Sequence, residues 1–393
     1  MTPSRKIGVL TGGGDVPGLN SVIKSVVYRA TELGFEVIGI RHGWRGLTDM
    51  QPGAELDPEN LLPLDRDNTR SIDRTGGTYL HTSRVNPARV KQASAPAHIP
   101  PERLKPLDTG KGYYDFTPIV LDNIQHLGLE YLIVIGGDDT LSFAKVLDAE
   151  GVPLIGIPKT MDNDVHGTEY CIGFSTAITR AKDAITRQRT TLGSHERIGI
   201  FRIFGRDSGY TALFTAYVTS ARCLLPEAPF DLERLINILM EDKRNNPSRY
   251  SLVIASEGAV WKGQGLEEYG EADAYGHKKK ADIGLALGEE IRKRTGEDVM
   301  NSDLTYDLRS GDPDALDKIV AITYANVAMD LVRDGARGRL VAVQDGKYTH
   351  APLPESKAGP RKVDVARMYN ADRFRPRYSG KLGFPLFLSS ERV

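Results

Sequence analysis

Three short apolar runs, each followed by a glycine-rich or acidic loop, constrain the fold of this chain more than any other feature. Residues 6–10 read KIGVL and lead into TGGGD, residues 131–135 read YLIVI and lead into GGDDT, and residues 152–157 read VPLIGI and lead into PKTMDND. Helical spacing follows at residues 22–33 and 141–150. The alternation predicts a parallel sheet with helices on both faces, whose carboxyl-end loops bind a ligand.

A second set of strand-like and helical patterns begins after Asp164. A helical pattern covers residues 177–189, strand-like runs cover residues 197–205 and 250–258, and residues 231–242 between them have amphipathic helical spacing. A chain of 393 residues is longer than one ordinary hydrophobic core supports, so we expect two domains.

Three segments fit neither pattern. Residues 96–117 are rich in proline and residues 261–280 in charge, so both are interpreted as surface insertions. The tail after Pro352 is basic, polar and too rich in proline for one long helix. We expect the last part of it, residues 357–393, to pack on the body or on a partner subunit.

The charge balance excludes bulk attraction to nucleic acid or membrane, because 51 Lys and Arg face 52 Asp and Glu. With 40% hydrophobic and 26% charged residues the chain has a globular composition. No run approaches the ~18 apolar residues of a membrane span. Cys171 and Cys223 lack the spacing of metal ligands, so we expect reduced core thiols in a cytoplasmic protein.

The three loops carry residues suited to phosphate chemistry. Gly12, Gly13 and Gly14 can turn tightly and present N–H groups to an anion, although a plain tight turn explains them equally well. The acidic loops contain Asp138, Asp139, Asp162 and Asp164, and Lys159 adds a positive charge. Solvated surface would explain one such loop, but two at consecutive strand ends favour a site for Mg²⁺ and phosphates. This mixture of charges suits phosphoryl transfer.

Seven segments together resemble the phosphofructokinase family in order and approximate spacing: GGGDVPGLN, GGTYLHTSR, GGDDT, PKTMDND, HERIGIFRIFGRDSGY, IASEG and LTYDLRSG. The resemblance runs from about Lys6 to Val343. It implies two Rossmann-like three-layer α/β/α domains with the active site in the cleft between them. Residues 1–173 plus about 309–356 would bind the phosphoryl donor and residues 174–308 the sugar phosphate. The family transfers a phosphoryl group to the 1-hydroxyl of fructose 6-phosphate with Mg²⁺.

Carried over residue by residue, the resemblance implies roles on the donor side. Asp162 looks like the base that takes the proton of the sugar hydroxyl, with Asp164 beside it, and Asp138 looks like the Mg²⁺ carboxylate. Thr160 would face the transferred group, and the donor phosphates would contact Gly13, Gly14, Arg84 and Lys159. The catalytic set predicted in this way comprises Asp162, Lys159, Asp139, Thr160 and Arg206.

On the sugar side, Phe204, Gly205 and Arg206 resemble the wall against fructose 6-phosphate, and Glu257 the carboxylate that accepts hydrogen bonds from its hydroxyls. The resemblance assigns the 6-phosphate to Tyr306 and Arg309, although a histidine often stands where Tyr306 is. Arg197 resembles an arginine that reaches the neighbouring subunit's sugar site, which implies a homodimer or homotetramer. A second such arginine is missing near Met300; either Arg292 or Arg294 replaces it, or fewer charges hold the 6-phosphate.

Two positions indicate the donor. ATP-using members of the family usually have glycine where Asp139 and Lys159 stand, whereas pyrophosphate-dependent members resemble this chain. A carboxylate at Asp139 would repel an ATP α-phosphate, and Lys159 could stabilise the leaving phosphate. The sequence therefore predicts pyrophosphate as donor, with an ATP-dependent enzyme or a non-catalytic regulatory subunit as alternatives.

An effector site is less readable from the sequence. Lys24, Arg189 and Glu227 stand near the positions of an inter-subunit effector site in regulated relatives, but Tyr28 replaces a charge. We expect weak or absent nucleotide control.

Overall fold

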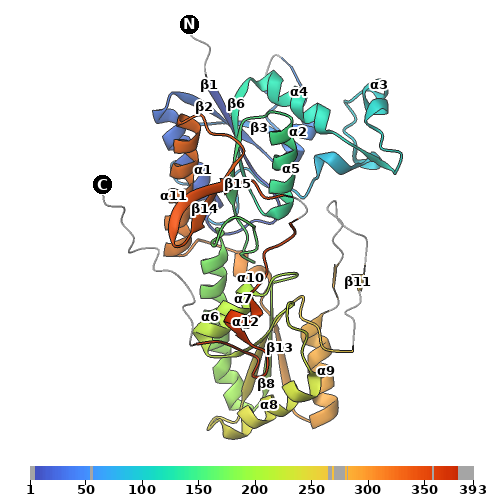
Figure 1. Ribbon diagram of the computed structural model, residues 1–393, viewed down its shortest axis with the longest axis vertical. Helices are drawn as coiled ribbons and strands as arrows, with labels where there is room; N and C mark the ends of the chain where they lie inside the picture. Colours follow the sequence, from blue (N-terminus) through green and yellow to red (C-terminus); the bar gives the residue numbers. More distant parts are fainter. Residues whose placement is uncertain are drawn as a thin grey trace.

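The computed structural model describes residues 5–53, 56–263, 268–269, 279–280, 282–355 and 358–378. Two sheets, each covered by helices, lie one above the other along the longest axis of the molecule (Figure 1). Most of segment 261–280, predicted as an insertion, lies outside the described residues.

The larger sheet has seven strands in the order β15-β14-β7-β6-β1-β2-β3. Strands β1 (Arg5–Thr11), β2 (Phe35–Ile40), β6 (Leu129–Gly136), β7 (Leu154–Pro158) and β14 (Arg339–Gln344) are parallel. The edge strands β3 (Leu61–Leu64) and β15 (Lys347–Pro352) pair antiparallel to their neighbours. The carboxyl ends of β1, β6 and β7, three neighbouring strands, therefore meet at one edge, as the sequence predicted.

Side chains alternate between the two faces of this sheet and explain its two helical layers. On β6, Ile133 and Ile135 pack with helices α1 (Leu19–Glu32) and α11 (Ala315–Arg333) in one buried cluster. Leu132 and Val134 point to the other face. There they pack with α2 (Trp44–Asp49), α4 (Thr117–Leu127) and α5 (Asp138–Ala149), so that burial on both faces accounts for the continuous apolar run.

The smaller sheet has four parallel strands in the order β13-β8-β10-β9. They comprise β8 (Ile198–Ile203), β9 (Arg222–Leu224), β10 (Ser251–Ser256) and β13 (Val299–Asp303). Helices α6 (Phe174–Ser194) and α7 (Tyr210–Thr219) cover one face, and α8 (Leu232–Asn245) and α9 (Ile283–Thr295) the other. The predicted α/β/α layering of both units is therefore confirmed.

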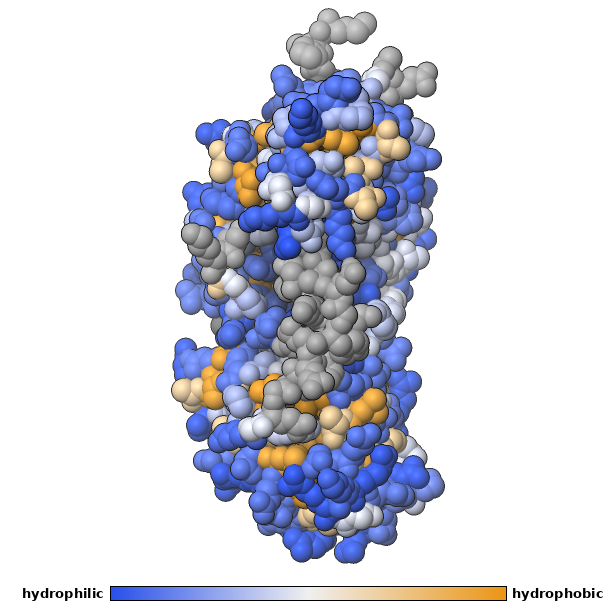
Figure 2. All heavy atoms as spheres, turned by 90° about the vertical axis from the view of Figure 1, so that its right-hand side faces the viewer, coloured by the Kyte–Doolittle hydropathy of each residue, from blue (hydrophilic) through white to orange (hydrophobic). Residues whose placement is uncertain are grey.

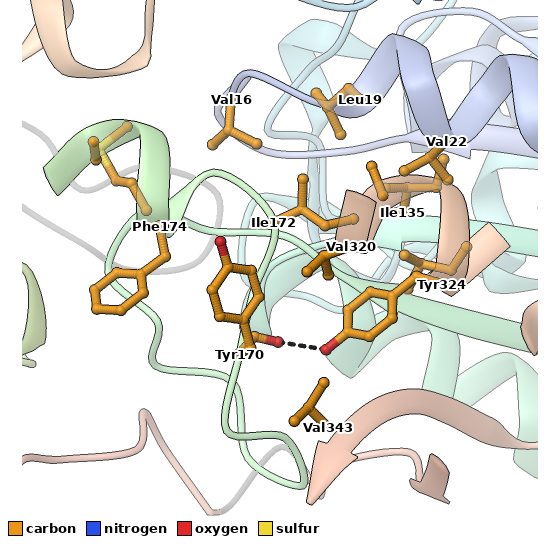
Figure 3. Close-up of a cluster of buried hydrophobic side chains, with 14 of the residues drawn as sticks. Val16, Leu19, Val22, Ile135, Tyr170, Ile172, Phe174, Val320, Tyr324 and Val343 are labelled. Atoms are coloured by element: carbon orange, nitrogen blue, oxygen red, sulfur yellow. Dashed lines mark hydrogen bonds between the residues drawn. The ribbon is translucent and has the colours of Figure 1, made fainter. Parts of the chain in front are cut away.

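The two sheets are joined through a buried cluster around Tyr170 and Tyr324 (Figure 3). The Tyr324 hydroxyl donates to the carbonyl of Tyr170 at 2.8 Å. The Tyr170 hydroxyl donates to Asp317 Oδ1 at 2.7 Å, and Asp317 also accepts from the backbone N–H of Gly173 and Thr176. Asp317 on α11 thereby fixes the start of α6, the helix that leads into the smaller sheet.

The two predicted insertions differ in their outcome. Residues 96–117 contribute to a small lobe with its own buried cluster, which includes Val90, Ile99 and Phe116, and with the short helix α3 (Pro101–Leu104). Trp261, where the second insertion was predicted to begin, is instead buried, with its ring edge-on to Phe230 at 6.1 Å. The sequence placed this boundary too early because the charge run that follows Trp261 outweighed the single aromatic residue.

The C-terminal segment returns to the smaller sheet after β15. Its described part packs on the body: Cys223 N–H donates to the Phe374 carbonyl, and the Tyr369 hydroxyl donates to the Cys223 carbonyl. Short helices and strands occur here, α12 (Val365–Met368), β16 (Tyr369–Asn370) and β17 (Arg375–Pro376). Packing on the body was one of the two alternatives for residues 357–393, and residues 358–378 follow it.

Both cysteines are buried and free, as expected.

The face in Figure 2 is mostly hydrophilic, with hydrophobic residues in small groups. Among the described helices, none is long and apolar enough to span a bilayer.

Candidate active site

A cavity of about 240 Å³ is lined by loops of both sheets. Its wall contains most of the residues that the sequence selected, and these come from the ends of β1, β6, β7, β8 and β10. The lining residues are Gly13, Gly14, Asp15, Val16, Arg84, Gly137, Asp138, Asp139, Thr140, Lys159, Thr160, Met161, Asp162, Asp164, Phe204, Arg206, Asp207, Glu257, Arg309 and Pro360.

The glycine loop after β1 allows the Lys159 side chain to come close. Gly13 has φ 80°, and a Cβ added there would lie 3.1 Å from Lys159 Nζ. Lys159 is almost fully buried, and burial together with the nearby charge of Arg84 lowers its pKa to about 8. Asp15 and Asp139 oppose this shift. A partly desolvated cation therefore lies directly beside the glycine loop.

The GGDDT segment is the start of a helix rather than a loop. Asp138 and Asp139 are the first two residues of α5, which contradicts the prediction that helix begins after Thr140. Carboxylates are favourable in the first turn because they face the positive end of the helix dipole. Both side chains line the cavity together with Arg84 and Arg309.

The PKTMDND loop carries the most perturbed carboxylates of the cavity. Burial raises the pKa of Asp162 well above its usual range, and Asp164 and Glu257 raise it further, while Arg206 opposes them. Burial also raises the pKa of Asp164 to about 6, and nearby Asp138 adds to the shift. Asp162 Oδ1 is buried and has no hydrogen-bond partner among the described residues. An acceptor is therefore available for a hydroxyl that enters the cavity.

The opposite wall comes from the smaller sheet. Phe204, Arg206 and Glu257 line the cavity. Gly205 does not line it but is needed between them: its φ is 122°, and a Cβ there would lie 2.1 Å from Ser256 Oγ. Sequence reasoning overlooked Arg202, whose Nη2 donates to Glu257 Oε2 at 3.4 Å and orients this carboxylate.

Of the three residues expected around the sugar phosphate, Tyr306, Arg309 and Arg197, only Arg309 lines the cavity of its own chain. Tyr306 is 69% exposed and lies outside the cavity, with the Arg309 guanidinium 4.8 Å above its ring. Arg309 lines the cavity on the side of the glycine loop, and its Nε lies 3.5 Å from Asp15 Oδ1. Arg197 also lies outside the cavity, 3.8 Å from Asp298 Oδ2. Its assignment to a neighbouring subunit stays a prediction.

Neither candidate for the missing second arginine faces the cavity. Arg292 Nη2 donates to the Val299 carbonyl at 2.8 Å, and Arg294 pairs with Glu290. Met300 packs against the buried cluster.

A model of the family described as Phosphofructokinase matches residues 6–332 of the chain. The chain belongs to the phosphofructokinase family. A pyrophosphate--fructose 6-phosphate 1-phosphotransferase of Streptomyces coelicolor is 36% identical over 365 residues, covering 92% of this chain and 97% of the relative. ATP-dependent 6-phosphofructokinase 3 of the same organism is 34% identical over 370 residues, covering 93% and 99%.

The fold comparison agrees with this assignment. The crystal structure of a pyrophosphate-dependent phosphofructokinase from Marinobacter aquaeolei has a TM-score of 0.74 to this chain, at 17% identity. The alignment covers 95% of this chain and 89% of that one. The predicted family and its two-sheet fold are thus confirmed.

In this phosphofructokinase chain, the cavity residues that sequence reasoning missed include Asp15, Asp207 and Pro360. Asp15 and Asp207 directly follow the motifs GGG and FGR, so their position beside the predicted residues was the available signal. Pro360 comes from the C-terminal segment, where no motif marked it. Its place depends on packing between distant parts of the chain.

The residues of the cavity fit the Mg²⁺ that phosphofructokinases generally use. Carboxylates from Asp138, Asp162 and Asp164 face one space, and the raised pKa of Asp164 reflects the repulsion from Asp138 as well as burial. A divalent cation would relieve this repulsion. The described residues contain no cluster of three His, Cys, Asp or Glu able to hold a metal by themselves. In phosphoryl-transfer sites Mg²⁺ usually binds through one or two carboxylates together with waters and substrate phosphates.

The three residues near a possible effector site each have other partners in the chain. Lys24 Nζ donates to Asp73 Oδ1, Arg189 donates to the Thr219 carbonyl, and Glu227 accepts from the backbone N–H of Gly209. Weak nucleotide control stays a prediction.

Proposed function

We propose that this phosphofructokinase transfers a phosphoryl group from pyrophosphate to the 1-hydroxyl of D-fructose 6-phosphate, reversibly and with Mg²⁺. The products are fructose 1,6-bisphosphate and phosphate. The observation that carries the choice of donor is the pair Asp139 and Lys159, both of which line the cavity.

The pair acts through charge and space. Lys159 is buried beside Gly13 and Gly14. Its ammonium would stabilise the leaving phosphate of a diphosphate bound on the glycine loop. Asp139, on the first turn of α5, would repel the α-phosphate of ATP, which pyrophosphate lacks. Preorganised charge of this kind usually contributes more to the rate of phosphoryl transfer than any other effect of the protein.

Asp162 acts as the base in this proposal. Its raised pKa, caused first by burial and then by Asp164 and Glu257, makes its carboxylate a stronger proton acceptor than an exposed aspartate. Oδ1 accepts the proton of the sugar 1-hydroxyl while the oxygen attacks phosphorus and the leaving phosphate departs toward Lys159. Thr160 lies between Lys159 and Asp162 in the sequence, and its hydroxyl accepts a hydrogen bond from the Asp162 N–H at 3.1 Å.

Asp138 would hold Mg²⁺, which would neutralise charge on the phosphoryl oxygens. Arg84 provides further positive charge from the protein in the same cavity. On the sugar side, Phe204 and Arg206 form the wall and Glu257, oriented by Arg202, accepts hydrogen bonds from the sugar hydroxyls. Tyr306 and Arg309 bind the 6-phosphate once the sugar enters, and Arg197 completes the site of a neighbouring subunit in a homodimer or homotetramer.

A comparison of donors on one preparation tests the proposal. Purified protein with Mg²⁺ and fructose 6-phosphate is given pyrophosphate or ATP, and fructose 1,6-bisphosphate is measured. We expect turnover with pyrophosphate to exceed turnover with ATP, and formation of pyrophosphate from bisphosphate and phosphate in the reverse assay. Equal or better turnover with ATP would refute the donor assignment.

An ATP-dependent reaction is the second candidate, because relatives named ATP-dependent 6-phosphofructokinase are nearly as similar in sequence as those named for pyrophosphate. The same assay separates the two. A regulatory subunit without chemistry is the third, and any turnover by the protein expressed alone excludes it. We further propose that the protein acts in glycolysis or gluconeogenesis in the cytoplasm.

A further inference from the structure

The segment just after residue 357 contacts loops of both sheets where they meet the cavity. Pro360 lines the cavity itself. The next three residues make hydrogen bonds on two sides. Arg361 contacts the base loop, residues 158–164, which carries Asp162. Lys362 and Val363 contact Tyr210 and Glu227 of the unit built on the smaller sheet, here called the sugar-side unit.

Arg361 holds the backbone of the base loop from behind. Its N–H donates to the carbonyl of Asp164 at 2.6 Å, and its Nη2 donates to the carbonyl of Asn163 at 2.8 Å. Nη2 also lies 3.3 Å from the carbonyl of Glu169. The carbonyls of Asn163 and Asp164, which follow Asp162 directly, are thus both held by one residue nearly 200 positions away in the chain.

Asn163 makes this point of the loop unusual. Its φ is 54°, a left-handed conformation that non-glycine residues seldom adopt, and its side chain is buried. Asn163 Nδ2 donates to the Glu169 carbonyl, and Oδ1 accepts from Cys171 N–H. The side chain of Asn163 and the side chain of Arg361 therefore both hold the turn that places Asp162 and Asp164 at the cavity.

The same segment is anchored to the sugar-side unit. The Arg361 guanidinium lies 4.4 Å above the ring of Tyr210, the first residue of α7, and the Tyr210 hydroxyl donates to the Lys362 carbonyl. Val363 N–H donates to Glu227 Oε1, which also accepts from Gly209 N–H at 3.0 Å. Residues 204–207, the sugar wall, are separated from Gly209 by Ser208 alone.

We propose that Arg361 is a positioning residue, which sets the distance and angle between the base Asp162 and the sugar wall by tying the base loop to α7. This inference rests on the proposed function of Asp162. A displacement of about 1 Å between a base and its substrate can cost about 100-fold in rate, so a tie at the two adjacent carbonyls has a large effect on catalysis. The planar guanidinium is suited to this role because it reaches two carbonyls and stacks on a ring at once, which an ammonium does not.

Three variants test the proposal: Arg361→Ala, Arg361→Lys and, as matched control, Arg377→Ala. Arg377 belongs to the same segment but is exposed, and its Nε donates to Tyr369 within that segment. In Arg361→Ala we expect kcat to fall about 10- to 100-fold, while KM for the phosphoryl donor changes less than about threefold, since the donor contacts Arg84 and Lys159 instead. Arg377→Ala should keep the kcat of the unaltered protein.

Two readouts separate positioning from general weakening of the fold. Arg361→Lys should recover part of the lost kcat, because one cation can still reach the Asn163 carbonyl. Millimolar guanidinium ion added to Arg361→Ala should raise kcat and leave Arg377→Ala unchanged. If Arg361→Ala does not fold, Tyr210→Phe, which removes only the hydroxyl on Lys362, should lower kcat severalfold with an unchanged donor KM.

The outcomes are distinguishable. If the unaltered protein turns over none of the donors with fructose 6-phosphate, the proposed function fails. If it is active and folded Arg361→Ala retains kcat within twofold, or if Tyr210→Phe does so where Arg361→Ala is unfolded, the positioning role alone is overturned. A loss that Arg361→Lys and guanidinium both fail to relieve also contradicts it.

Discussion

Lys159 Nζ donates to the carbonyl of Gly14 at 2.7 Å, and the backbone N–H of Lys159 donates to the carbonyl of Gly136 at 3.0 Å. One residue thereby joins the loops after β1, β6 and β7, so the cation lies where these three strands end. The side chain of Lys159 is buried, which restricts its position and lowers its pKa.

The first prediction concerns pH. With a pKa lowered to about 8 by burial, Lys159 loses its proton as pH rises through that value, so kcat/KM for the donor should fall above about pH 8. Asp139 raises the pKa of Lys159, so Asp139→Asn should move this alkaline limb to lower pH. Lys159→Arg, whose guanidinium does not deprotonate, should abolish the limb in the activity that remains. If the alkaline limb is unchanged in both variants, the loss of activity at high pH does not come from deprotonation of Lys159.

The second prediction concerns the donor. Replacing Asp139 by glycine together with Lys159→Gly removes the repelling carboxylate and the cation that serves the leaving phosphate. We expect the ratio of kcat/KM for pyrophosphate to that for ATP to fall at least about 100-fold, given the ~10²- to 10³-fold effect of one preorganised donor. Asp148→Asn, near the other end of α5, is the matched control and should leave the ratio unchanged. A double variant with the same ratio would show that other residues select the donor.

The third prediction concerns the base. Asp162→Asn keeps the size of the side chain but removes the proton acceptor, so kcat should fall about 10³-fold or more, toward the upper range for general bases. The thermal unfolding temperature should be unchanged or higher, because the variant removes a carboxylate whose charged form is disfavoured by burial and by neighbouring negative charges. Asp183→Asn, an exposed site on α6, serves as control. Near-normal turnover of Asp162→Asn would remove Asp162 from the base role.

The sequence predicted the parts of this site that depend on local pattern. Apolar runs and the glycine-rich or acidic loops after them located β1, β6 and β7, and therefore the edge at which Asp138 and Lys159 meet. It misjudged the start of α5, because adjacent aspartates are typical of loops yet are also favourable in the first turn of a helix. The direction of Arg309 and the arrival of Pro360 depend on packing between distant segments, for which no local pattern exists.

The fourth prediction concerns Arg197, which lies outside the cavity of its own chain. If it acts on a neighbouring subunit, Arg197→Ala should raise KM for fructose 6-phosphate, since a charged hydrogen bond is worth ~1.5 to 3 kcal/mol. A mixture of Arg197→Ala and Asp162→Asn chains, refolded or co-expressed, should be more active than either alone. One site of each hybrid dimer would then hold the intact Asp162 of one chain and the intact Arg197 of the other.

The control for this experiment is a mixture of unaltered and Asp162→Asn chains that carry different affinity tags, in which co-purification of the two tags shows whether subunits exchange. Lack of recovery in the test mixture, with exchange demonstrated, would place Arg197 in the site of its own chain or outside any site.

The last prediction concerns stability. Asp317 is fully buried and accepts from Tyr170, Gly173 and Thr176, so an amide in its place would turn its NH₂ group toward one of these donors. Asp317→Asn should lower the free energy of unfolding by at least about 2 kcal/mol, the cost of unsatisfied buried hydrogen-bonding groups. Asp330→Asn, at a surface ion pair on the same helix, should change it by less than about 1 kcal/mol.

The pH dependence of that cost follows from the raised pKa of Asp317. Burial raises it from 3.8 to about 6, so the stabilising contribution of this group is fully present below about pH 4 and is lost as pH rises through about 6. The cost of Asp317→Asn should therefore be larger at pH 5 than at pH 8, by about 1 kcal/mol. Denaturant unfolding of both proteins at the two pH values measures the difference, and a larger cost at pH 8 would mean that the hydrogen bonds to the carboxylate outweigh its burial.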